Sequence, residues 1–336
     1  MILHPGILAL LTGSTIVLAM MLYASGLGVQ ILRRWDFNSS SERQLTLERK
    51  TYLVSTLIHY ALGFEIVSGL LFVYTLDEIH PLFVGAMCAT GSLNANPIGW
   101  QALYVKMAMF FAASLWIVLN RLDQSAEDYP LVRPKYGALL FLTYLVALDV
   151  YYQFAYFLGL SPSVITSCCG SLFSATGTHL AAGLSGLPAH PMMAALYGVG
   201  AFFLATGIWS LKSAAALPRA LFSLAGAGFF FVAIAAIISY ICLYIYEMPT
   251  HHCPFDILQR HYAFIGYPIY LTLFGAALFA LFPGVFLPLR RRRALAAALA
   301  RKERSWITLA LLFMLAFLAL ATWPVGAGHF TLAGYP

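Results

Sequence analysis

The sequence predicts an all-α membrane protein, a polytopic bundle of eight transmembrane helices with both termini on the outer, periplasmic side. Hydrophobic residues make up 61% of the 336 residues and charged residues only 10%, whereas soluble domains carry about 25% charged residues. Long apolar runs recur along the whole chain, separated by short polar stretches. Lys and Arg residues gather in alternate polar stretches. This composition excludes an ordinary soluble enzyme.

Each predicted span is long enough to cross a bilayer, which needs roughly 20 mostly apolar residues. The spans are 6–32, 51–76, 101–122, 138–160, 192–213, 219–246, 263–288 and 305–324. They form one integral membrane domain, 1–336, arranged as four hairpins. Small residues such as Ser223 and Gly226 predict close contacts between helices.

The basic residues predict the orientation, because Lys and Arg in short loops stay in the cytoplasm. They follow the first, third, fifth and seventh spans, and only Lys106 and Arg260 lie toward the other face. We therefore expect a multi-pass protein of the bacterial inner membrane. The Arg290–Arg293 run is interpreted as a flank that stops translocation rather than a nucleic-acid site. The basic, Ala-rich segment 294–304 is expected to lie along the anionic inner leaflet.

All five cysteines and eight of the nine histidines fall on the predicted outer side, mostly in the long outer loops 77–100, 161–191 and 247–262. The candidate metal ligands among them are Cys88, Cys168, Cys169, His251, His252 and Cys253. Thiolates with imidazoles suit copper or zinc, and a haem at the outer edge is an alternative. Two other interpretations stay open, namely thiol redox chemistry and structural disulfides.

The segment His252-Cys253-Pro254-Phe255 resembles the Cys-Pro-x-Cys loop of membrane thiol oxidoreductases. Asp256 stands where that loop has its second cysteine. The resemblance implies thiol redox activity only if Cys253 pairs with Cys88, Cys168 or Cys169.

Four ionisable residues fall inside the predicted spans: His59, Glu65, Lys106 and Asp149. Such groups are costly in hydrocarbon and need a partner or a function. One interpretation is a buried Glu65–Lys106 ion pair that fixes helix packing, with Lys106 reaching outward. The other is a proton or cation path that rises from His59 through Glu65 and Asp149.

Glycine-rich phosphate loops are absent from the sequence, so no nucleotide cofactor is expected, and no catalytic residue stands out. The favoured hypothesis is an inner-membrane protein whose outward Cys/His cluster handles a soft metal or electrons. The alternative is a permease, or a membrane-anchor subunit of a larger transport or electron-transfer complex, with the cysteines in disulfides. Expected partners are the lipid bilayer, other membrane subunits, or a periplasmic redox or metal-carrying protein, and no nucleic acid.

Overall fold

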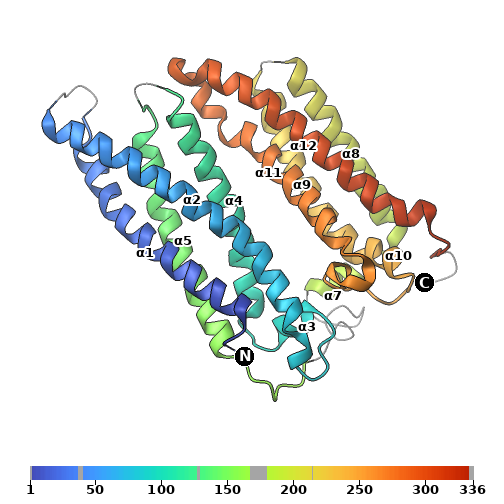
Figure 1. Ribbon diagram of the computed structural model, residues 1–336. Coiled ribbons are helices and arrows are strands. Elements are labelled where there is room, and N and C mark those ends of the chain that lie inside the picture. Colours follow the sequence, from blue (N-terminus) through green and yellow to red (C-terminus); the bar gives the residue numbers. More distant parts are fainter. Residues whose placement is uncertain (1, 37–40, 127–128, 167–179, 214, 333–336) are drawn as a thin grey trace. The chain divides into compact units, whose positions relative to one another are not determined.

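The computed structural model describes residues 2–36, 41–126, 129–166, 180–213 and 215–332. Within these ranges every regular element is helical, and eight helical segments are long and apolar enough to cross a membrane (Figure 1). The predicted fold class and the predicted spans are thereby confirmed, while the side on which the termini lie stays a prediction. The protein is a multi-pass membrane protein in contact with the bilayer.

The first of two compact units comprises Met1–Val84 and Ser92–Val164. Its four long helices form a closed ring, in which α1 packs on α2 and α5, and α4 packs on the same two helices. The helices are α1 (Pro5–Arg34), α2 (Glu42–Glu78), α4 (Gly99–Asp123) and α5 (Val132–Leu158), with the short η1 (His80–Leu82) after α2. The short α3 (Ala89–Asn94) comes before α4, and its residues are divided between this unit and the second one.

The second unit comprises Gly85–Gly91 and Ile165–Pro336. Its four long helices form a ring of the same kind, in the order α8, α9, α11, α12 and back to α8. The long helices are α8 (Ala189–Lys212), α9 (Ala216–Ala236), α11 (Gly266–Val285) and α12 (Arg293–Ala327). The short elements are α7 (Leu180–Ser185), η2 (Ile237–Ile241), α10 (Cys242–Tyr246), η3 (Asp256–Leu258), η4 (Arg260–Tyr262) and η5 (Leu287–Arg291). The sequence predicted one domain, and that grouping stays a prediction beside these two units.

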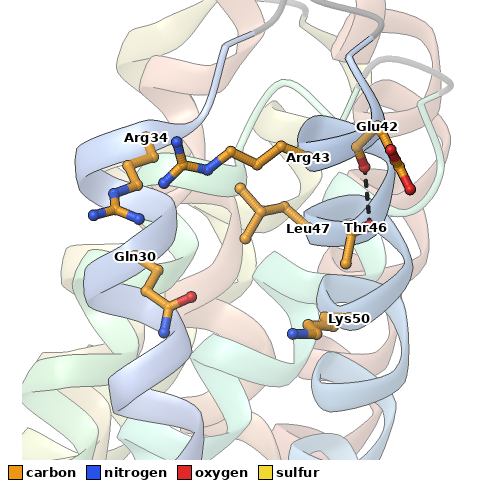
Figure 2. Close-up of a pocket in the computed structure, with 7 residues that line it drawn as sticks. All are labelled: Gln30, Arg34, Glu42, Arg43, Thr46, Leu47 and Lys50. Atoms are coloured by element: carbon orange, nitrogen blue, oxygen red, sulfur yellow. Dashed lines mark hydrogen bonds between the residues drawn. The ribbon is translucent and has the colours of Figure 1, made fainter.

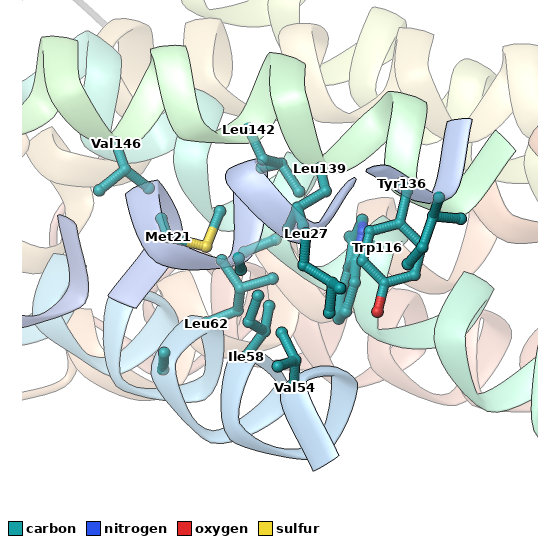
Figure 3. Close-up of a cluster of buried hydrophobic side chains, with 14 of the residues drawn as sticks. Met21, Leu27, Val54, Ile58, Leu62, Trp116, Tyr136, Leu139, Leu142 and Val146 are labelled. Atoms are coloured by element: carbon teal, nitrogen blue, oxygen red, sulfur yellow. The ribbon is translucent and has the colours of Figure 1, made fainter. Parts of the chain in front are cut away.

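Apolar side chains from all four long helices fill the interior of the first unit (Figure 3). Met21 of α1, Ile58 and Leu62 of α2, Trp116 of α4 and Val146 of α5 are almost completely buried in this cluster. Exposed positions of the same helices are also apolar, for example Val67 and Leu70 of α2. The buried stripe of each helix is therefore set by packing rather than by a contrast in polarity.

Several helices begin earlier than the hydropathy predicts, and the difference is largest for α2 and α12. α2 begins at Glu42, because the Ser41 side chain caps it by accepting from the backbone N–H of Gln44 at 3.4 Å. α12 begins at Arg293, so segment 294–304, which was expected to lie along the inner leaflet, is continuous with the last membrane helix. The buried Glu303 explains this, because it pairs with Arg219 of α9 at 2.7 Å and holds these turns against the bundle.

Small residues bring α9 and α11 together, as predicted. A Cβ atom placed on Gly226 would lie 2.3 Å from the Cβ of Ala280. One turn away, the Ser223 hydroxyl donates to the Ala280 carbonyl at 2.6 Å and accepts from the Gly284 N–H at 2.8 Å. Gly228 has no such neighbour, so only one face of α9 needs small residues.

Candidate metal centre

Two cysteines from distant parts of the chain meet in the second unit. The Sγ atoms of Cys88 and Cys253, 165 residues apart in sequence, lie 3.5 Å from each other. This is much longer than the about 2.05 Å of a disulfide, so no covalent bond joins them in the structure. Both side chains are completely buried. A carboxylate oxygen of Asp256 completes the group, with the three ligand atoms all within 4.8 Å of one another.

Hydrogen bonds to backbone carbonyls hold the two cysteine segments in place. The Gln259 side-chain amide donates to the carbonyl of Met87 at 2.7 Å and so ties the Cys253 loop to the residue before Cys88. Tyr246 donates to the carbonyl of Cys253, and Tyr270 donates to that of Pro254 at 2.7 Å. The positions of the sulfur atoms are therefore fixed by neighbours that do not belong to the group.

Two residues near the cysteine segments adopt backbone conformations with a positive φ angle. Glu247, which ends α10, adopts a left-handed conformation with φ of 55°, and the chain then reverses into the Cys253 loop. Gly85, three residues before Cys88, has φ of 86°, and a Cβ atom there would lie 2.6 Å from the Thr166 carbonyl oxygen. Only glycine meets both conditions at position 85.

The surroundings of the two thiols are largely apolar. Ile238 packs against both, and Ile234 and Phe255 are among the partly buried side chains beside them. The Thr90 hydroxyl lies 3.3 Å from the Cys253 Sγ. Two thiolates would be unfavourable in such a setting without a positive charge between them.

Asp256 begins η3, is nearly buried, and uses its two carboxylate oxygens differently. Oδ2 bonds to Nε2 of His251, and Oδ1 is buried without a hydrogen-bond partner among the described residues. A carboxylate that is oriented by an imidazole and keeps one unused oxygen is typical of a metal ligand with its outer-shell partner.

His252 points elsewhere. Its Nδ1 donates to the carbonyl of Ile238 at 2.8 Å, within the π-helical turn between α9 and α10. Burial lowers the pKa of His252 below 6.5, so the ring is neutral at pH 7. The π turn interrupts the regular helical hydrogen bonds, and such turns frequently occur beside functional sites.

Of the six predicted metal ligands, Cys88 and Cys253 are brought together, and His251 reaches the group through Asp256. His252 does not belong to it, and Cys168 and Cys169 lie outside the described residues. Sequence reasoning missed Asp256 as a candidate ligand. Its place three residues after Cys253, where a second cysteine would be expected, was the available signal.

The predicted intramembrane residues lie in the first unit. Lys106 contacts Asp149 at 2.8 Å and Glu65 at 3.3 Å, and is only 2% exposed, so it does not reach outward. His59 is separate from them, with its Nε2 3.5 Å from Arg121 near the far end of α4. The sequence suggested the Glu65–Lys106 pair but not the contact of Lys106 with Asp149.

A surface pocket of about 390 Å³ lies where α1 ends and α2 begins (Figure 2). It is lined by Gln30, Arg34, Glu42, Arg43, Thr46, Leu47 and Lys50. Its three basic side chains belong to the Lys/Arg-rich stretch that the sequence assigns to the cytoplasm. The pocket contains none of the candidate site residues.

Comparisons of the chain with protein-family models, with curated proteins and with solved structures found no match.

Proposed function

We propose that this membrane protein binds a soft transition-metal ion, copper or zinc, through Cys88, Cys253 and Asp256. The observation that carries the proposal is the convergence of two buried sulfur atoms and a carboxylate within 4.8 Å. Cysteine sulfur is the ligand that distinguishes Zn²⁺ and Cu⁺ sites from those of Mg²⁺ or Ca²⁺.

The sulfur separation fits such an ion. Two sulfurs at about 2.3 Å from a tetrahedral zinc would lie about 3.8 Å apart, and the observed separation is 3.5 Å. Two thiolates and the Asp256 carboxylate would carry three negative charges, and a divalent ion would reduce this to one. His251, bonded to Asp256, would orient the third ligand.

The sidedness of the site belongs to the proposal. The distribution of Lys and Arg supports a cytoplasmic location for the loop between α1 and α2. The segments of Cys88 and Cys253 would then face the periplasm of a bacterial inner membrane, where a metal-carrying or redox protein could exchange with the site.

Metal analysis of the purified, detergent-solubilised protein tests the proposal. We expect stoichiometric copper or zinc in the wild type, and its loss in Cys88→Ser and in Cys253→Ser. Cys242→Ala is the matched control, because Cys242 is also buried but stands outside the group. Metal retained in both serine variants would overturn the assignment.

The separation of 3.5 Å also supports a second candidate, a dithiol that exchanges with the disulfide of a partner protein. The two cysteines would give up two electrons and two protons, and the partner's disulfide would be reduced to two thiols. Counting the reactive thiols separates the two candidates. An oxidised redox pair would show two additional thiols after treatment with a reductant. A metal-loaded site would show two additional thiols after treatment with a chelator.

A further inference from the structure

A second buried polar cluster lies in the first unit, independent of the cysteines. Its centre is the Lys106 ammonium of α4, which donates to Asp149 Oδ2 of α5 at 2.8 Å, to Glu65 Oε2 of α2 at 3.3 Å, and to the Ser68 hydroxyl at 2.8 Å. Both carboxylate side chains are 0% exposed. Lys106 is seven residues into α4, about 10 Å from its first residue along the helix axis.

The formal charges in this cluster do not balance. Two carboxylates and one ammonium leave one negative charge, and all three side chains are buried. Among the described residues, the other side chains that the hydrogen bonds connect to this group are neutral, namely Ser14 of α1, Ser68 of α2 and Gln153 of α5. A net charge buried in a membrane helix bundle is strongly unfavourable, so a further positive charge is required.

The cluster also lacks hydrogen-bond donors. Glu65 Oε1, Asp149 Oδ1 and Gln153 Oε1 are all buried and have no partner among the described residues. The Gln153 amide nitrogen is already used, because it donates to Asp149 Oδ2 at 2.6 Å and to the Ser14 hydroxyl at 3.1 Å. A proton on one carboxyl group would supply the missing donor and remove the excess charge.

We propose that Glu65 and Asp149 share one exchangeable proton, which makes this cluster a proton-binding site within the membrane. Both carboxyl groups contact the same ammonium, so they are close enough for the ionisation of one to oppose that of the other. The proton belongs to the pair rather than to either residue. A metal cation suits the site less well, because the Lys106 ammonium would repel it.

Infrared difference spectroscopy of the full protein in liposomes, recorded as the pH is changed, tests this proposal. The wild type should show the C=O stretching band of a protonated carboxyl group that disappears at high pH. Glu65→Gln and Asp149→Asn should each lose the band, because the remaining carboxylate is neutralised by Lys106. Glu42→Gln, which changes an exposed carboxylate at the start of the same helix, should retain it.

Three results would overturn the proposal. They are the absence of the band at every pH at which the wild type stays folded, its persistence in both variants, and its displacement by Na⁺ or K⁺ at constant pH. The last result would mean that a cation balances the charge. The first and third are measured on the wild type, so they stand even if a variant does not fold.

Discussion

At the scale of single residues, buried charges in this protein divide into balanced and unbalanced groups. Asp123 and Lys135 lie 2.6 Å apart, almost fully buried, and their charges cancel. Asp123 also accepts from the backbone N–H of Leu131 and so fixes the connection between α4 and α5. Such a pair has a structural role. The Glu65–Lys106–Asp149 cluster, in contrast, has an excess negative charge. At the other site, Asp256 has an unused carboxylate oxygen beside two thiols. These features favour a functional role for each of the two sites.

Adjacent histidines allow a sharp test of the metal centre. His251→Gln should weaken metal affinity about 10–100-fold, because the imidazole that orients Asp256 is lost. His252→Gln should change affinity little, because that ring bonds to the Ile238 carbonyl instead. Competition with a chelator measures both affinities, and an equal effect of the two substitutions would contradict the assigned roles.

The sequence allowed part of the site to be predicted. The one-sided placement of the cysteines put Cys88 and Cys253 among six candidate ligands, but nothing in the spacing shows that residues 165 positions apart converge. That contact depends on long-range hydrogen bonds such as the one from Gln259 to Met87. Asp256 is an ordinary loop aspartate until the fold places it beside two sulfur atoms.

At the scale of helices, close packing of α9 on α11 depends on one glycine. Gly226→Ala should destabilise the protein by about 1–3 kcal/mol, because the new methyl group would overlap Ala280. Gly228→Ala, two residues along the same helix, meets no neighbour within 4 Å and should be neutral. Thermal unfolding in detergent compares the two variants, and equal stability would show that α9 and α11 are not in contact there.

Hydropathy predicts the existence of each long helix, but it does not predict the residues at which each helix begins and ends. The first span was predicted as 6–32 and is found at Pro5–Arg34, because its ends coincide with the apolar run. α2 and α12 extend further, since the Ser41 cap and the Glu303–Arg219 pair stabilise polar turns that hydropathy excludes. Specific side-chain contacts of this kind are invisible to an average over a window.

At the scale of the whole chain, eight spans form two four-helix rings of the same connectivity. Hydropathy could not predict this grouping, because side chains facing lipid and side chains facing another helix are equally apolar. Exposed Val67 and buried Ile58 on α2 illustrate the point.

The orientation in the membrane is testable with reporters fused to the C-terminus. If both termini are outside, an alkaline phosphatase fusion should be active and a green fluorescent protein fusion dark, since the first needs the periplasm and the second the cytoplasm. The same fusions placed after Lys212, in the loop that follows α8, should give the opposite pattern. Matching signals at both positions would refute the predicted sidedness.

X-ray absorption spectroscopy at the metal edge of the purified protein tests the central claim most directly. The account predicts about two sulfur neighbours at about 2.3 Å, with lighter oxygen or nitrogen neighbours at about 2.0–2.2 Å. The sulfur signal should disappear in the Cys88→Ser, Cys253→Ser double variant. A bound metal surrounded only by oxygen and nitrogen, or unchanged sulfur scattering in that variant, would contradict a centre built from Cys88, Cys253 and Asp256.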